Sequence, residues 1–334
     1  MTRSPQMLAT VLGLTWLVGL VVGAPFVFGE DNAPLTDAQR ASIPRLIEKL
    51  DAESFADREA ASRELVEIGE PAVTLLDAAV QDGSPEVRKR AAAILRRINR
   101  PVMQAGFLEL ARQPDEKIDL EQGMWFISRI LNPRVRRADL DRPLDEIADR
   151  VRATLGKNQT PKELSPRIVV DAVRKIVFEE YGFKGNDADY KNPDNSSLER
   201  VLATRKGLPI MLSHVVVAVA RRLDVPIVGL PTPGRYIVKY DGAKAPAGFP
   251  KDDIHLHPYE GGRLLQRADL QQIFPGLNLD EPISPSTNRE VLQRMLNNLQ
   301  SHLFERNQNE KGYLAIEFSA VLDEHNPRKA VPQP

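Results

Sequence analysis

Apolar positions recur every three to four residues between residues 36 and 100, and this spacing predicts helices. Thr36 stands where a helix N-cap is expected. Gly69 and Gly83 are each followed by a proline two residues later, a pattern typical of one helix ending and the next beginning. We therefore expect four helices in this stretch.

The predicted helices contain an internal repeat. Its two copies are Arg58, Ala61 and Leu65, and Arg88, Ala91 and Leu95. Small alanines let neighbouring helices approach closely, and leucines pack between those helices. Residues 36–100 therefore resemble HEAT-like repeats. Arrays usually need more than two units to stand alone, so we expect this module to pack against the rest of the chain. Its role is either a protein-binding surface or a structural extension.

Helical spacing continues from residue 103 to about residue 182. A capping-box pattern beginning at Ser196 predicts a short helix that ends at Gly207. The next helix, from Pro209 to about Leu223, is apolar on nearly all faces. A helix of that kind is buried, so it is expected to form the centre of the core.

After this helix the hydrophobic period changes to two. The segments VPIVGL, RYIVKY, DIHLHPY and GRLLQ read as short strands joined by turns rich in proline and glycine. Residues 287–325 return to helical spacing and predict a helical hairpin. The fold class is therefore α+β, with a buried helix on a small antiparallel sheet.

The charge balance and the absence of cysteine limit the possible functions. The chain has 334 residues, with 45 Lys and Arg against 46 Asp and Glu. Nucleic-acid binding needs a basic excess, so no nucleic-acid partner is expected. The absence of cysteine excludes disulfides, cysteine-ligated metals and thiol nucleophiles. No cofactor is indicated.

The N-terminus predicts export. Arg3 precedes an uncharged apolar run from Met7 to Gly29, the pattern of a signal peptide, with Ala24 or Gly29 as cleavage points. The same run is long enough to remain as a membrane anchor. Either way the rest of the chain is expected outside the cytoplasm, periplasmic or extracytoplasmic, with membrane contact only through residues 7–29.

Many short motifs resemble one family in the same order. They include GFKGN, NPDNSSLERVLATRKGLPIMLS, PGRYIVKY and HPYEGGRLL, with IDLEQGMWFISRILNP upstream and RMLNNLQSHLFER downstream. Together, over roughly residues 115–326, they resemble the SirB-type transglutaminase-like family. The resemblance implies a papain-like core and a tetratricopeptide-like C-terminal hairpin.

Active transglutaminase-like enzymes carry a Cys–His–Asp triad, and the resemblance maps those positions onto this sequence. The Cys position falls at or beside Pro209, the His position at Arg235 and the Asp position at His257. A thiolate at a helix N-terminus would be the nucleophile, and the imidazole its base. Proline cannot attack and arginine stays protonated, so the triad is degenerate and no catalytic residue is predicted.

Two other catalytic arrangements are open. Ser213 and His214 are neighbours on the central helix, where adjacent side chains diverge by about 100° and rarely make a catalytic contact. Asp253, His255 and His257 alternate along one predicted strand, and such residues can ligate zinc. They form an alternative metal site, although no metal is the primary expectation.

Basic residues are predicted at and around the positions that the catalytic triad occupies in active enzymes. Arg235, Lys239, His257 and Arg263 form a candidate basic cleft that recognises carboxylate or phosphate groups. The alternative is that the arginines serve structural ion pairs.

These patterns divide the chain and set the expected function. The predicted segments are 1–29 as leader or anchor, 36–100 as HEAT-like repeats, 103–280 as the transglutaminase-like domain and 286–326 as the C-terminal hairpin. The sequence favours an exported, non-catalytic protein that binds a protein or peptide partner or acts as a scaffold in the cell envelope. The competing hypothesis is a hydrolase or acyltransferase with a relocated or metal-assisted site around His257 and Asp253.

Overall fold

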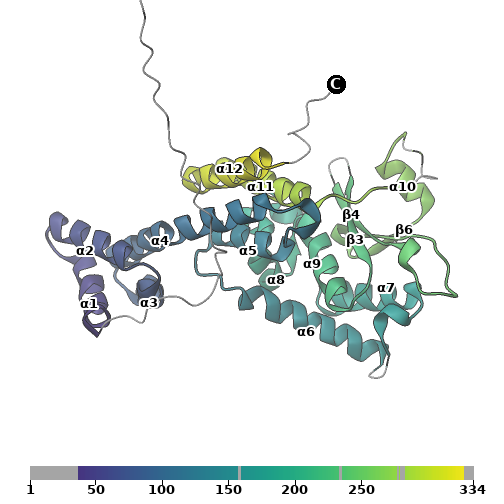
Figure 1. The fold of residues 1–334 in the computed structure, drawn as a ribbon, viewed down its shortest axis with the longest axis horizontal. Helices are drawn as coiled ribbons and strands as arrows, with labels where there is room; N and C mark the ends of the chain where they lie inside the picture. The colour runs from purple at the N-terminus through teal and green to yellow at the C-terminus, as the bar shows by residue number, and fades with distance from the viewer. Residues whose placement is uncertain (1–36, 157–158, 233–234, 277, 279–282, 327–334) are drawn as a thin grey trace, which may run out of the picture.

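The computed structural model describes residues 37–156, 159–232, 235–276, 278 and 283–326 (Figure 1). The predicted leader or anchor, residues 1–29, lies outside them. Among the described residues, none of the helices has the length and apolar character to span a bilayer. Figure 1 shows the first helices at one end of the molecule and the sheet at the other.

Four helices form the N-terminal module. They are α1 (Asp37–Glu48), α2 (Phe55–Ile68), α3 (Val73–Asp82) and α4 (Pro85–Arg112). Ser54 and Ser84 cap α2 and α4 by accepting backbone N–H bonds. The repeated alanines and leucines, Ala61, Leu65, Ala91 and Leu95, are all buried in one apolar cluster. The predicted repeat therefore forms the core of this module.

Helix α4 is longer than the sequence pattern predicts. A helix end was expected at Arg100, before Pro101, but α4 continues to Arg112. Its second half buries Met103, Phe107 and Leu110 in the main core, which compensates for the backbone hydrogen bond that a proline removes. One continuous helix thus joins the repeat module to the rest of the protein.

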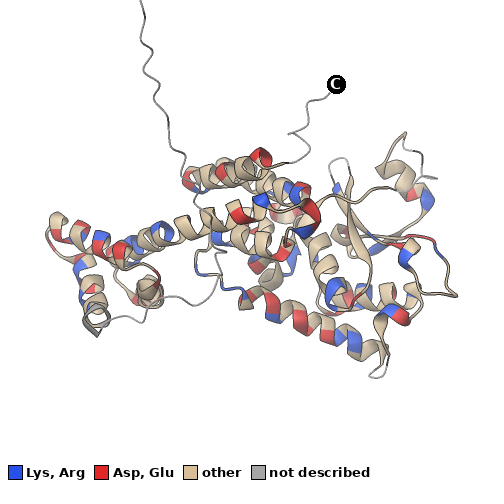
Figure 2. Ribbon diagram, viewed as in Figure 1, with Lys and Arg blue, Asp and Glu red and all other residues tan. Residues whose placement is uncertain are grey.

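A second group of helices follows. They are α5 (Leu120–Leu131), α6 (Ala138–Leu155), α7 (Pro166–Arg174), which continues as a π-helical segment (Lys175–Glu180), and α8 (Leu198–Thr204). Figure 2 shows acidic and basic residues interspersed along α6, as the balanced composition predicts.

The ends of α8 correct the predicted capping. The hydroxyl of Ser197, not Ser196, accepts the N–H of Arg200, because Ser196 belongs to the preceding 3-10 turn. The helix ends at Thr204, before Gly207, since Arg205 adopts a left-handed conformation with φ of 62°. Its guanidinium lies over the rings of Tyr181 and Phe183, and these contacts hold the strained residue in place.

The central helix α9 (Pro209–Arg222) lies against an antiparallel sheet, as predicted. The sheet has the order β3-β4-β5-β6. Its strands are β3 (Ile227–Thr232), β4 (Arg235–Tyr240), β5 (Ile254–His257) and β6 (Arg263–Leu265), and the two-residue strands β1 (Lys184–Gly185) and β2 (Lys206–Gly207) form a separate parallel pair. The α+β class is therefore confirmed.

The two faces of the sheet have different neighbours. Tyr236, Val238 and Leu256 belong to the main core with α9. Ile237 and Leu265 alternate with them and pack with residues of α10 (Arg267–Ile273) on the other face. Side chains on that second face include Arg235, Lys239, His255, His257 and Arg263, by the same alternation.

The C-terminal helices α11 (Asn288–Glu305) and α12 (Asn309–Glu324) lie beside each other and against α4 and α5 (Figure 1). Thr287 and Glu290 form a capping box at the start of α11. The ring of Phe318 stacks on Phe107 of α4 with centroids 4.2 Å apart. This hairpin therefore contributes to the main core.

Candidate functional site

The first turn of α9 contains no nucleophile. Leu208 is its N-cap and gives no side-chain bond, and Pro209 occupies the first helical position. Leu208, Pro209 and Ile210 are all buried, and the Leu208 N–H donates to the carbonyl of Asn195. The position that the family resemblance assigns to a cysteine is thus a packed, apolar helix start.

The other two triad positions meet at one carboxylate. Glu260 lies in the 3-10 turn Pro258–Glu260 that follows β5. Its oxygens are 3.4 Å from Arg235 Nη1, 2.8 Å from Arg263 Nε and 3.5 Å from His257 Nε2. Arg263 also pairs with Asp269 of α10 at 2.7 Å. We call Arg235, His257, Glu260 and Arg263 the Glu260 cluster.

Burial favours the neutral form of His257 in this cluster. Its ring is almost fully buried, and neither ring nitrogen has a hydrogen-bond partner, since the Glu260 contact lacks hydrogen-bond geometry. Burial lowers the pKa of His257, and the charges of Arg235 and Arg263 lower it further, against the opposing effect of Glu260. A base in this position needs a hydroxyl or thiol to deprotonate, and none bonds to it among the described residues.

Lys239 does not belong to the Glu260 cluster. The predicted basic cleft placed it there, but Lys239 Nζ donates to Asp253 Oδ2 at 2.7 Å. The second carboxylate oxygen of Asp253 accepts the N–H of Gly242 at 2.9 Å. The sequence pattern placed Asp253 beside His255 and His257 but missed its pairing with Lys239, because that pairing depends on the register between β4 and β5. The four predicted residues therefore divide into two separate groups.

The alternative metal site lacks a set of ligands. His255 lies opposite Lys239 in the sheet, and burial lowers the pKa of its imidazole. Asp253 is already paired with Lys239, whose ammonium group repels a cation. Across the ranges that the structure describes, no three His, Cys, Asp or Glu side chains gather in a geometry suited to a metal ion.

Ser213 and His214 do not form a catalytic couple. Ser213 Oγ donates to the carbonyl of Tyr236 at 3.2 Å, and this hydrogen bond links α9 to β4. The His214 ring lies 5.5 Å from the Tyr236 ring, between centroids, and burial lowers its pKa to about 4. His214 is therefore a neutral imidazole at physiological pH.

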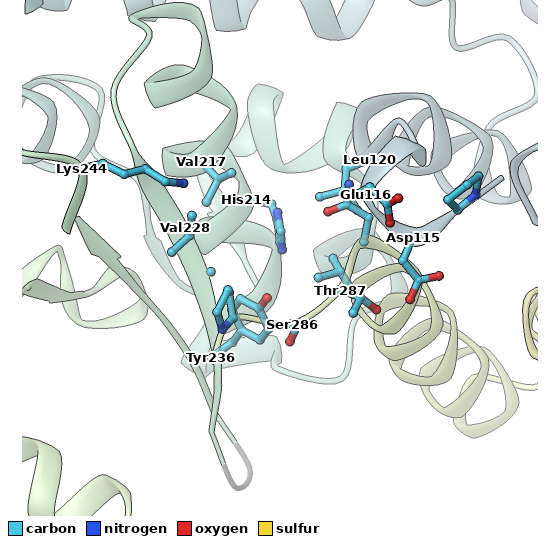
Figure 3. Close-up of a pocket in the computed structure, with 15 residues that line it drawn as sticks. Asp115, Glu116, Leu120, His214, Val217, Val228, Tyr236, Lys244, Ser286 and Thr287 are labelled. Atoms are coloured by element: carbon cyan, nitrogen blue, oxygen red, sulfur yellow. The ribbon is translucent and has the colours of Figure 1, made fainter. Parts of the chain in front are cut away.

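A cavity of about 720 Å³ opens beside His214 (Figure 3). Its lining includes Leu120, Val217, Val228, Tyr236, Ser286 and Thr287. Figure 3 shows the His214 ring projecting between Leu120 and Val228, and its Nε2 has no hydrogen-bond partner. The cavity can hold an apolar group with one polar atom at the imidazole. Sequence reasoning missed it because its walls come from segments far apart in the chain.

Comparison with known protein families gives two matches. Residues 138–297 match the family model described as the transglutaminase-like superfamily, and residues 43–122 match the model of HEAT repeats. The second match extends beyond Arg100 and includes the continuous helix α4. No match was found among solved structures.

Relatives occur in bacteria and animals. A UPF0162 protein of Xylella fastidiosa is 33% identical over 141 residues, which cover 39% of this chain and 47% of that protein. The UPF0162 protein YchA of Escherichia coli is 27% identical over 195 residues, 56% of this chain and 69% of that protein. F-box only protein 21 of Homo sapiens is 27% identical over 209 residues, 57% of this chain and 33% of that protein.

The match spans about half the length of the Xylella relatives. The matched regions include α9, the sheet, the Glu260 cluster and most of α11. Residues 138–297 of the chain therefore match a domain of the transglutaminase-like superfamily, preceded by a match to HEAT repeats.

Proposed function

We propose that this chain is a non-catalytic transglutaminase-like protein that binds a protein or peptide partner and acts as a scaffold. The observation that carries the proposal is the buried Pro209 at the first turn of α9. Acyl transfer requires a nucleophile at that helix start, and neither Pro209 nor its apolar neighbours supplies one. The chain has no cysteine that could replace it.

The Glu260 cluster supports the same conclusion. Arg235 and Arg263 are held by Glu260 in ion pairs, and His257 is neutral and buried beside them. An oxyanion site needs donors that point at an open position, whereas these donors already have a carboxylate partner. The interactions that remain are structural.

A direct test uses the purified full chain with casein and a primary-amine donor, and separately with a peptide library for hydrolysis. No turnover above buffer is expected from the wild type or from His257→Ala. Turnover by the wild type that disappears in His257→Ala would instead establish the competing hydrolase or acyltransferase around His257 and Asp253. Lys244→Ala, on an exposed lysine outside the Glu260 cluster, is the matched control.

We also propose that the chain is exported and works in the cell envelope. The support is the uncharged run from Met7 to Gly29 after Arg3. A fusion of alkaline phosphatase to the C-terminus of the full chain is expected to be active, because that enzyme folds only outside the cytoplasm. Deletion of residues 1–29 is expected to abolish that activity, and an inactive full-chain fusion would contradict export.

A further inference from the structure

A second pocket lies where the repeat module meets α5 and the C-terminal hairpin. It has a volume of about 530 Å³ and its walls come from α4, α5 and α12. These three helices pack against one another, as Figure 1 shows for α4 and α12. Its lining residues belong neither to the Glu260 cluster nor to the cavity beside His214. We call it the junction pocket.

Unpaired cations surround the junction pocket. Arg96, Arg97, Arg129 and Lys311 line it, and across the described ranges none of the four has a carboxylate partner in an ion pair. Arg100 also lines it but pairs with Glu317 at 2.8 Å. Glu310 is the single acidic residue of the lining. The lining of the pocket therefore carries more positive than negative charge.

Arg129 is a cation of this lining with little solvent exposure and no ion-pair partner among the described residues. It is only 9% exposed, and burial lowers the pKa of its guanidinium against the opposing charges of Glu70 and Asp77, neither of which forms an ion pair with it. Its Nε donates to the carbonyl of Pro133 at 3.2 Å, and its guanidinium lies 4.8 Å from the Trp125 ring centroid. A buried charge without a contacting carboxylate destabilises the fold, so a bound anion would reduce that penalty.

Lys311 and Asn99 add two further groups. Lys311 Nζ donates to the carbonyl of Leu131 at 3.2 Å and keeps two N–H bonds for a ligand. Asn99 is 2% exposed, and its amide nitrogen donates to the carbonyl of Leu95 at 2.8 Å. Its Oδ1 is buried and has no hydrogen-bond partner, so it can accept a hydrogen bond from a ligand.

These groups together select one ligand chemistry. Cations alone would suit phosphate, but an unpartnered acceptor beside them calls for a ligand that also carries an N–H. Met103, Ile130 and Leu314 supply apolar wall, which suits a hydrophobic side chain next to the charge. A free peptide C-terminus that ends in an apolar residue has all three features.

We propose that the junction pocket binds the C-terminal carboxylate of a peptide or protein partner whose last residue is apolar. The carboxylate lies at Arg129 and Lys311, a peptide N–H donates to Asn99 Oδ1, and the last side chain packs on the apolar wall. The proposal rests on the peptide-binding part of the proposed function. It does not depend on the absence of catalysis.

The test uses fluorescein-labelled Gly-Gly-Leu, Gly-Gly-Phe and Gly-Gly-Met, each as free acid and as C-terminal amide, with the full chain and fluorescence anisotropy. At least one free acid is expected to bind about tenfold or more tightly than its amide, because a charge-assisted bond is lost in the amide. Arg129→Met is expected to remove the preference for the acid. Arg142→Met, on an exposed arginine of α6, is the charge-matched control and is expected to bind as the wild type does.

Stability gives a second readout for Arg129. Without ligand, Arg129→Met is expected to leave the midpoint urea concentration of unfolding unchanged or to raise it. The reason is that an unpaired buried charge is replaced by an apolar side chain. A large fall in the midpoint would show that Arg129 is structural and would overturn the proposal. Equal binding of acids and amides, or no binding of any acid, would also overturn it.

Inorganic phosphate separates the proposed ligand from a simple anion. The proposal fails if phosphate binds the wild type as tightly as the best peptide acid, since the acceptor and apolar wall would then contribute nothing. Failure here is distinct from failure of the proposed function. Partner capture from envelope extract that persists in Arg129→Met would show binding at another surface.

Discussion

Arg289 and Asp115 form a buried ion pair, with Nε to Oδ1 at 2.7 Å, that joins the C-terminal hairpin to the chain segment after α4. Arg289 is 1% exposed and its side chain also donates to the carbonyls of Leu322, Ala111 and Gln113. Ala111 and Gln113 lie at the end of α4, where carbonyls lack helical partners. One guanidinium therefore satisfies groups from two parts of the chain that are distant in sequence.

Arg289→Leu is expected to lower the free energy of unfolding by about 3–5 kcal/mol, because the buried carbonyls and the partly buried Asp115 lose their donor. Urea denaturation followed by circular dichroism measures this. Arg142→Leu is the control, since Arg142 forms an exposed ion pair within α6 and its removal costs less than about 1 kcal/mol. Similar losses in the two variants would show that the Arg289 network contributes little.

His214 makes stability depend on pH. Burial lowers its pKa from 6.5 to about 4 in the folded protein, so between these values the unfolded chain binds a proton that the folded chain does not. Stability is therefore retained above pH 6.5 and falls as the pH decreases towards 4. We expect His214 to remove about 2 kcal/mol between pH 7 and pH 5.

The comparison variant for this prediction is His214→Phe, which keeps a ring beside Tyr236 and cannot titrate. Its loss of stability between pH 7 and pH 5 is expected to be smaller than that of the wild type. The remaining loss comes in part from His255, His257 and His302, whose pKa values burial also lowers. Identical pH profiles for His214→Phe and the wild type would exclude a buried, neutral His214.

Local pattern predicted the elements of the fold well. Alternation located the strands, and the all-round apolar character of α9 placed it in the core. The errors came where tertiary packing overrides local preference. Pro101 lies inside α4 because the following turns are buried, and Arg205 takes a positive φ because two aromatic rings hold its side chain.

The sites were harder to predict because they depend on contacts between distant segments. The family resemblance located Arg235 and His257, but their meeting at Glu260 requires the register of β5 and the turn after it. Lys239 lies on the same face of the sheet as Arg235, yet Lys239 forms its ion pair with the nearby Asp253. The junction pocket joins Arg129 of α5 to Lys311 of α12, and no local spacing connects such residues.

The charge of Glu260 partly offsets the effect of burial, which lowers the pKa of His257. Its carboxylate favours the protonated imidazole, so Glu260→Gln is expected to lower the pKa of His257 further below its ordinary value. Arg235→Gln is expected to shift the same pKa upward, because the guanidinium disfavours a second positive charge. Two-dimensional ¹H–¹⁵N NMR of the imidazole nitrogens across a pH titration measures both shifts. Shifts of the same sign in the two variants would contradict this arrangement.

Pro209→Cys tests whether the start of α9 is closed. The chain has no cysteine, so the new thiol is the only one, and its reaction with Ellman's reagent reports on this position alone. Because residue 209 is buried, we expect reaction at least about 100-fold slower than for Thr204→Cys on the exposed end of α8. Fast reaction would indicate an open cleft in which the helix N-terminus activates the thiol.

Gly106 lets α4 and α5 approach closely. A Cβ at this position would lie 2.1 Å from Cζ of Phe126, a ring in the core of α5. Alanine favours helix over glycine by about 1 kcal/mol, but the clash costs about 1–3 kcal/mol, so Gly106→Ala is expected to lower the free energy of unfolding. Adding Phe126→Leu makes room for the new methyl group, so the double variant is expected to lose less stability than the sum of the two single changes. Urea denaturation of all four proteins in this cycle measures the coupling, and strict additivity would show that the helices can separate to accommodate a side chain at residue 106.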